Sequence, residues 1–315
     1  MSVRIGDLDY ELPEELVAQR PVEPRDASRL LVYERASGAI RHRRFRDLPE
    51  ELGPERLVVV NDTRVLPGRI RGRRPGGGVA EVLLLERGED GLWDALARPS
   101  RRLRPGIRID GAELVTDYGS GRWRVRVEGE PHGEPPLPPY IVERLADPER
   151  YQTVYAVEAG SAAAPTAGLH FTPELLARLE VASVTLHVGL DTFRPIQADT
   201  VEAHPIHSER YQVSTAEWDR IRRAGSVVAV GTTSVRVLES VARGAPLSGR
   251  TDLFITPGFE FRRVDALVTN FHLPRSSLLA LVMAFVGVDE TRRLYELAIE
   301  ERYRFYSFGD AMLVL

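Results

Sequence analysis

The sequence contains no cysteine and no lysine, and both absences limit its chemistry. Without cysteine the chain has no disulfide, no thiolate nucleophile and no cysteine-ligated iron–sulfur cluster. All 42 basic residues are arginine, which excludes a lysine Schiff base and the phosphate-binding lysine of a P-loop. Asparagine is scarce too, since Asn61 and Asn270 are the two in the chain. Covalent catalysis by a thiol or an amine side chain is therefore ruled out.

Long apolar segments are also missing. Residues Met1 to Tyr10 mix charged and apolar side chains and contain no apolar stretch of a signal peptide, which predicts a cytoplasmic protein. The longest apolar run, Leu278 to Val288, is about half of the roughly 20 residues that cross a bilayer. It therefore predicts a buried helix and no membrane partner. The composition, 43% hydrophobic and 28% charged in 315 residues, is that of an ordinary globular chain of one large or two medium domains.

Three common fingerprints of nucleotide-binding and hydrolytic enzymes are absent from the sequence. Neither the P-loop spacing nor Gly-x-Gly-x-x-Gly occurs, and the glycines at positions 76–78 lie between predicted strands as a turn. The nucleophile elbow Gly-x-Ser-x-Gly is missing as well. A common serine hydrolase is therefore not expected.

Charge is unevenly distributed along the chain. The net charge is −4, yet from Arg64 to Arg126 there are 14 arginines against 8 acidic residues, a local balance of +6. Such a concentration is a candidate phosphate footprint, although a basic segment is more often a solvated surface. Within it, arginine and apolar residues alternate, so that Arg122, Arg124 and Arg126 share one face of a predicted strand. That face would meet solvent or phosphate.

Two patterns of secondary structure divide the chain. Between residues 63 and 149, short strand-like runs are separated by glycine and proline turns without a helical period, which predicts a small inserted antiparallel β-barrel domain. Residues 1–62 and 150–315 are expected to form an α/β main body, because strands and helices alternate through the second half. The helices predicted for this second half are 173–180, capped by Thr172, 215–224, 232–241, 276–286 and 289–301, and its strands are 181–188, 227–230, 253–256 and 264–269.

Histidines cluster in the second half of the sequence. His170, His187, His204 and His207 fall within 38 residues, and His272 follows further on. They are predicted to lie in loops or at strand ends, where catalytic groups usually sit, although any one alone is more often a hydrogen-bonded interior histidine. The His-x-x-His pair at 204 and 207 could form half of a metal site, but it lacks the glutamate of the zinc-protease motif and contains a proline. The metal interpretation is therefore the weaker one.

Three further loops contain polar groups suited to a ligand. The segment Gly231 to Arg236 follows a buried strand and opens a helix, where backbone N–H groups and hydroxyls could hold a carboxylate or another anion. Simple N-capping would use the same residues. Both asparagines end predicted strands, in Asn61 to Arg64 and in Asn270 to Pro274. These loops indicate either ligand contact or ordinary turn chemistry.

Several short segments are informative when they are taken together. They are Asp26 to Leu31, Asn61 to Val65, Ala164 to Thr172, Leu186 to Leu190, Thr192 to Pro195, Val230 to Arg236, Thr269 to Pro274, Tyr303 to Phe305 and Gly309 to Met312. In order, and over nearly the whole chain, they resemble the hallmark runs of the S-adenosylmethionine:tRNA ribosyltransferase-isomerase family of queuosine biosynthesis. The chain departs from that pattern at Asp191, where glycine is expected, at Ile206, where methionine is expected, and at Arg275, where lysine is usual.

The resemblance implies a specific enzyme reaction. The family transfers the ribosyl part of S-adenosylmethionine to the aminomethyl group of a deazaguanine precursor at the tRNA wobble position and isomerises it, giving epoxyqueuosine in tRNA, adenine and methionine. S-adenosylmethionine is then consumed as a substrate, and no separate cofactor or metal is expected. The lack of cysteine agrees, because the radical chemistry of that molecule needs an iron–sulfur cluster.

The resemblance also suggests roles for individual residues. The sulfonium acidifies the adjacent ribose carbon, and a base is needed to remove its proton. We expect this base to be His170 or His187, because the side chain of histidine ordinarily titrates near neutral pH. His204 and His207 would assist proton transfer to adenine or orient the donor. The methionine carboxylate or the ribose hydroxyls are expected to contact Thr232, Thr233 and Arg236, and the deazaguanine or adenine to contact Asn270 and His272. Further substrate contacts are expected from Asn61, Asp62, Arg64, Thr166 and Arg194. The tRNA backbone is expected to contact Arg122, Arg124 and Arg126.

Two competing interpretations stay open at this point. One is a metal-dependent hydrolase built on His170, His187, His204 and His207. The other is a non-catalytic RNA-binding protein in which the barrel alone matters. A monomer is expected under the preferred interpretation.

Overall fold

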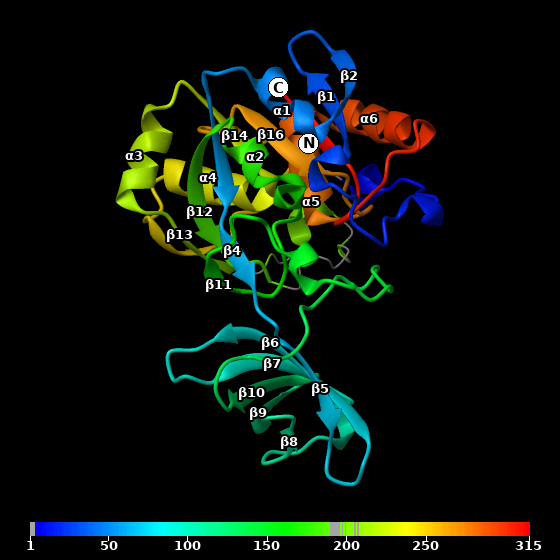
Figure 1. Cartoon of the computed structure of the whole chain (residues 1–315), viewed down its shortest axis with the longest axis vertical. Coiled ribbons are helices and arrows are strands. Elements are labelled where there is room, and N and C mark those ends of the chain that lie inside the picture. Colours follow the sequence, from blue (N-terminus) through cyan, green and yellow to red (C-terminus); the bar gives the residue numbers. More distant parts are fainter. Residues whose placement is uncertain (1–3, 190–195, 197, 199, 205, 207) are drawn as a thin grey trace.

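The computed structural model describes residues 4–189, 196, 198, 200–204, 206 and 208–315. Figure 1 shows a large α/β body and, below it, a smaller body made mainly of strands. The predicted fold class, an α/β main body with an inserted antiparallel β-barrel, is confirmed. None of the helices in the described part of the chain combines the length and the hydropathy needed to span a bilayer.

The large body is built on one mixed sheet of nine strands among the described residues. Their order is β15 (Ser248–Thr251), β13 (Glu209–Gln212), β12 (Glu180–Leu186), β3 (Arg56–Asn61), β14 (Ser226–Val230), β16 (Ala266–Asn270), β17 (Ala311–Val314), β1 (Arg29–Glu34) and β2 (Ala39–Arg44). The four central strands β12, β3, β14 and β16 are parallel to one another. Their carboxyl ends therefore lie along a single edge of the sheet, where α/β proteins commonly bind ligands.

Both faces of this sheet are buried. On β3, Val59 packs into one apolar cluster with residues of α4 (Gly231–Ala242) and α5 (Ser277–Val286). Its neighbours Val58 and Val60 point the other way, into a second cluster that contains Phe45 and Phe171. Strands buried on both faces appear in sequence as continuous apolar runs, which explains why the predictions for the central strands held. The remaining helices are α1 (Leu48–Leu52), α2 (Pro173–Leu176), α3 (Thr215–Arg223) and α6 (Val288–Glu300).

The small body is a six-stranded antiparallel sheet that curls into a nearly closed barrel. Its strands run in the order β5 (Arg69–Arg73), β6 (Val79–Arg87), β7 (Trp93–Arg98), β10 (Arg122–Val127), β9 (Ala112–Gly119) and β8 (Arg108–Ile109). Closure depends on Gly72, because a Cβ there would lie 3.1 Å from the side chains of Ile109 and Asp110 on the opposite edge. Trp123 fills the interior at 1% exposure. The short strands β4 (Thr63–Val65) and β11 (Glu158–Ser161) pair where the chain passes between the bodies (Figure 1).

Several local predictions differ from the structure. The predicted strand 253–256 is wrong, since the backbone there is irregular and the neighbouring segment 248–251 forms β15. Strands β9, β13 and β17 were not predicted. The helix expected at 173–180 begins where predicted, with the Leu175 N–H donating to the Thr172 hydroxyl at 3.2 Å, but it ends after one turn.

Candidate active site

A cleft of about 530 Å³ lies between the two bodies, at the carboxyl edge of the parallel strands. The barrel contributes residues of β6, β7 and β10, and the α/β body contributes the ends of β11 and β12 with the start of α4. The residues in its lining that were predicted from the sequence are His187, His204, Thr232, Thr233, Arg236 and Arg122. Residues as far apart in the sequence as Leu85 and Leu281, 196 positions, therefore line one cavity. The residues of the α/β body meet there because parallel strands end at the same edge of the sheet.

Asn61, at the end of β3, ties the floor of this cleft together. The side chain is fully buried, and its Oδ1 accepts from the Leu186 N–H at 2.9 Å while its Nδ2 donates to the Leu186 carbonyl at 3.0 Å. Nδ2 also donates to the Thr233 hydroxyl at 3.2 Å, and Oδ1 accepts from the Thr63 N–H at 3.2 Å. Asn61 thus fixes the end of β12, the start of α4 and the start of β4.

His187 follows directly on β12 and lies in the wall of the cleft. Its Nδ1 lies 2.8 Å from the hydroxyl oxygen of Thr63. Its ring packs on Gly160, where a Cβ would come within 2.7 Å of the His187 Cε1. Burial lowers the pKa of His187 below its ordinary value, and the nearby cation of Arg210 lowers it further. The imidazole is therefore neutral at pH 7 and able to accept a proton.

Thr232 and Thr233 lie in the first turn of α4, which opens on the cleft. A helix start presents backbone N–H groups and the positive end of the helix dipole, so an anionic group is favoured there. The Ser234 hydroxyl, in contrast, donates back to the Val230 carbonyl at 2.8 Å and serves the helix itself.

Arg236, one turn further along α4, is committed to protein partners. Its guanidinium forms a buried ion pair with Glu209 of β13, both side chains being at most 10% exposed. It also donates to the carbonyls of Leu253 at 3.0 Å and Thr251 at 3.1 Å. Glu209 accepts in addition from the Gly189 N–H at 2.9 Å. Arg236 therefore braces one wall of the cleft, whatever it contributes to a ligand.

A second group of predicted residues forms a buried network that does not line the cleft. His170 approaches the Ser28 hydroxyl through Nδ1 at 2.8 Å and the Asn270 amide through Nε2 at 3.2 Å. The Asn270 Oδ1 accepts from the Thr166 hydroxyl at 3.2 Å. His272 contacts the Thr269 hydroxyl through Nε2 at 2.7 Å. Burial lowers the pKa of His170 and of His272 to about 3, so both are neutral interior histidines.

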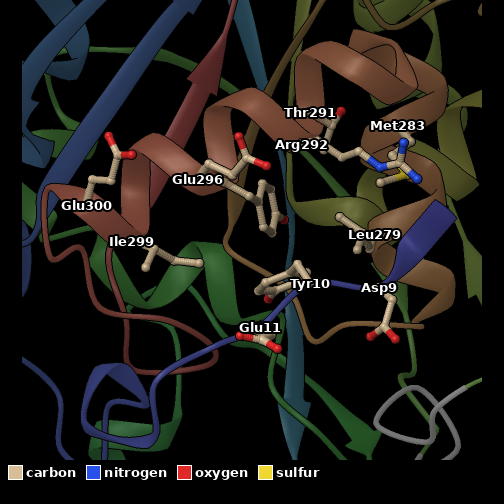
Figure 2. Close-up of a pocket in the computed structure, with 11 residues that line it drawn as sticks. Asp9, Tyr10, Glu11, Leu279, Met283, Thr291, Arg292, Glu296, Ile299 and Glu300 are labelled. Atoms are coloured by element: carbon tan, nitrogen blue, oxygen red, sulfur yellow. The ribbon is translucent and has the colours of Figure 1, made fainter. Parts of the chain in front are cut away.

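A separate cavity of about 470 Å³ lies between the N-terminal segment and helices α5 and α6, and two of the residues that line it, Tyr10 and Tyr295, hydrogen-bond to the backbone of His272. The Tyr295 hydroxyl accepts from the His272 N–H at 3.0 Å, and the Tyr10 hydroxyl donates to the His272 carbonyl. Figure 2 shows Tyr10 in this cavity with the carboxylates of Glu11 and Glu296 nearby. The two tyrosines screen His272 from it and meet edge to face at 5.3 Å.

The remaining predicted residues fall into three groups. Asp62 accepts from the Thr185 hydroxyl at 2.6 Å, and burial raises its pKa. Arg64 pairs with Glu149 at 2.7 Å on the surface. Arg194 and His207, like Asp191, lie outside the described residues.

The three arginines of β10 share one face, as predicted, but differ in their partners. Arg124 is held by Asp90 and, at 3.0 Å, by Asp94. Arg126 pairs with Glu113 at 2.8 Å. Arg122 lines the cleft, and no acidic residue in the described part of the chain pairs with it.

Sequence reasoning missed the apolar wall of the cleft. Leu253, Phe254 and Ile255 all line it. Three consecutive side chains cannot face the same side of a regular strand, because successive side chains point to opposite faces. The irregular backbone at these residues, where a strand was wrongly predicted, therefore allows all three to line the cleft. The Phe254 ring lies 6.1 Å from that of His204, in an edge-to-face arrangement.

The metal-dependent alternative gains no support from this geometry. His170 and His187 are held by different partners, one in the interior and one in the cleft. Within the described ranges, no group of three or more histidine and carboxylate side chains is placed to hold a metal ion.

The fold and the cleft together define an α/β protein whose cleft is shared with an inserted β-barrel. The chain belongs to the queuosine biosynthesis protein family, whose sequence model matches residues 5–314. The resemblance inferred from the short segments is thereby confirmed.

Individual relatives match over their whole length. A protein of Symbiobacterium thermophilum named S-adenosylmethionine:tRNA ribosyltransferase-isomerase is 54% identical, covering 99% of this chain and 100% of the relative. One of the same name from Rubrobacter xylanophilus is also 54% identical, covering 99% of this chain and 98% of the relative. Among solved structures, S-adenosylmethionine tRNA ribosyltransferase from Thermotoga maritima is 40% identical, with a TM-score of 0.58 over 98% of this chain and 100% of that one.

Proposed function

We propose that this chain is an enzyme that transfers the ribosyl moiety of S-adenosylmethionine to the aminomethyl-deazaguanine precursor at the tRNA wobble position and isomerises it. The products are epoxyqueuosine-tRNA, adenine and methionine. The observation that carries the proposal is the cleft between body and barrel, where a neutral histidine, a helix start and an arginine of the barrel line one cavity.

We further propose that the barrel domain spans 63–149 between body segments 1–62 and 150–315, and that the enzyme is a cytoplasmic monomer using no resident cofactor.

The cleft offers a place for each part of the donor. The start of α4 with Thr232 and Thr233 suits the methionine carboxylate. Phe254 on the apolar wall suits a flat heteroaromatic base such as adenine, since aromatic rings stack on one another. His187 then acts as the base that removes the proton from the ribose carbon bonded to sulfur. His170, Asn270 and His272 support the sheet edge from behind instead of contacting substrate.

The reaction is tested with the wild-type protein, radiolabelled S-adenosylmethionine and tRNA that carries the precursor. We expect adenine to be released only when all three are present, and the label to appear in the tRNA. Adenine released equally without tRNA, or tRNA bound without any release, contradicts the proposal. The second outcome would instead support a non-catalytic RNA-binding protein.

The tRNA backbone is expected to enter the cleft beside Arg122. Replacing Arg122 by Ala should remove one phosphate contact and reduce the slope of log Kd against log salt by about 1. Arg126→Ala is the matched control, because it lies on the same face of β10 but is paired with Glu113 at 2.8 Å. Filter binding of precursor tRNA at several salt concentrations measures both slopes. If the two variants lose the same slope, or neither loses any, the backbone does not pass Arg122.

A further inference from the structure

The hydroxyl of Thr63 lies between two groups at the rim of the cleft. Thr63 belongs to β4, is fully buried and pairs in parallel with Glu158 of β11. Its Oγ1 is 2.8 Å from the Nδ1 of His187 and 3.4 Å from the carbonyl oxygen of Glu158. No role follows for Thr63 from the sequence pattern beyond its place in the Asn61 to Val65 segment.

The single hydroxyl proton decides which nitrogen of His187 is protonated. A carbonyl oxygen can only accept a hydrogen bond, whereas a neutral imidazole nitrogen either donates or accepts. When Thr63 donates to the Glu158 carbonyl, its oxygen can only accept from His187. Nδ1 then carries the proton, and Nε2 keeps its lone pair. The opposite arrangement leaves the Glu158 carbonyl oxygen facing the hydroxyl oxygen without a proton between them, which is unfavourable.

The neighbouring backbone holds this arrangement in place. The Thr63 N–H donates to the Asn61 Oδ1 at 3.2 Å, and the same oxygen accepts from the Leu186 N–H. The backbone N–H of His187 donates to the backbone carbonyl of Arg210 at 2.9 Å. With Gly160 against its ring, His187 has little freedom to turn Nδ1 away from Thr63.

We propose that Thr63 is a positioning residue that fixes His187 in the tautomer protonated on Nδ1, so that Nε2 is the proton acceptor of the cleft. The tautomer follows from the hydrogen bonds alone, while its use in catalysis rests on the proposed function. A positioned partner that selects the tautomer of a catalytic histidine is a general device of acid–base sites.

Nitrogen NMR on the full-length protein labelled with ¹⁵N-histidine tests the proposal, because protonated and unprotonated ring nitrogens have distinct chemical shifts. The His187 signals are assigned by their loss in His187→Gln. In the wild type at pH 8 we expect Nδ1 to be protonated and Nε2 unprotonated. Thr63→Val, which keeps the shape but removes the hydroxyl, should shift His187 toward the opposite tautomer and lower the turnover rate about tenfold, with the KM for S-adenosylmethionine unchanged. Thr63→Ser should restore both.

Thr185→Val is the matched control, since Thr185 lies on β12 beside the same site but donates to Asp62 at 2.6 Å. It should leave the His187 tautomer unchanged. Finding wild-type His187 protonated on Nε2, or the same tautomer in Thr63→Val as in wild type, overturns the proposal. If the wild type has the expected tautomer but His187→Gln keeps full turnover, the role of Thr63 in fixing the tautomer is supported. The catalytic role of His187 in the proposed function is then contradicted.

Discussion

Replacing His187 by Gln is expected to lower the rate of ribosyl transfer by about 100-fold to 10,000-fold, the range typical for loss of a general base. Glutamine keeps much of the shape and polarity of the ring but cannot accept a proton. Because the side chain is held by Thr63 and Gly160 without filling the core, the fold should persist. Single-turnover release of adenine from S-adenosylmethionine, with saturating tRNA, measures the effect. Near-normal release from a folded variant would show that another group is the base.

The pH dependence of the same rate gives a second measure of His187. Burial first, and then the charge of Arg210, lower the pKa of His187, while Glu86 and Glu158 act in the opposite direction. Only the neutral ring accepts a proton, so the rate should stay level at pH 7 and fall on the acid side below the ordinary histidine value of about 6.5. Arg210→Gln removes one of the lowering charges and should move this fall to higher pH. An unchanged acid limb in that variant contradicts the assignment.

Gly160→Ala disturbs the same histidine without removing it. The added Cβ would lie 2.7 Å from the His187 Cε1, closer than real Cβ atoms come, so the ring must move away from Thr63. We expect a fall in turnover and also a loss of unfolding free energy, because Gly160 has a φ of +156°, which L side chains rarely adopt. Gly249→Ala is the control, because Gly249 has the same φ of +156° but nothing lies within 4 Å of a Cβ at that position. Equal rates for the two variants would mean that the ring position is unimportant.

The sequence predicted the body and the barrel because their patterns depend on neighbouring residues. The run Val58 to Val60 is buried on both faces of the sheet and is continuously apolar. The alternation in β10 matches its buried Trp123 and Val125 and its more exposed arginines. What the sequence could not predict depends on distant partners. Strand β17 forms because Ala311 to Val314 can pair with β1, 281 positions earlier, and with β16.

The site was predicted as a set of loops but not as a geometry. His170 and His187 are equivalent in sequence terms, since both follow or precede short apolar runs. They differ because His170 packs against Phe45 at 4.9 Å between ring centroids, whereas His187 borders the cleft. Likewise, nothing local distinguishes Arg122 from Arg124; the acidic partners of Arg124 come from β7 and the turn before it. Both differences arise from tertiary packing, which cannot be inferred from a single sequence.

The two buried histidines are expected to make the protein markedly less stable in mild acid. His170 and His272 have pKa values of about 3 in the folded chain, lowered mainly by burial, whereas in the unfolded chain each titrates near 6.5. Above pH 6.5 both states are neutral and the histidines add no pH dependence. Below it the unfolded chain binds protons that the folded chain refuses, so stability falls continuously until about pH 3. At pH 5 the loss should be about 2 kcal/mol for each histidine.

Urea unfolding between pH 7.5 and 5 measures this loss, and the slope rather than the absolute stability is the informative quantity. Most carboxylates stay ionised in this window, so histidines dominate the change. His170→Gln keeps a polar side chain facing Ser28 and Asn270 but cannot titrate, so it should reduce the slope below pH 6.5 by about 1.4 kcal/mol per pH unit even if it is less stable at pH 7.5. His272→Gln should do the same, and the double variant should lose both contributions. A slope unchanged in both single variants would mean that these histidines are protonated in the fold, which their hydrogen bonds to Asn270 and Thr269 would then have to accommodate.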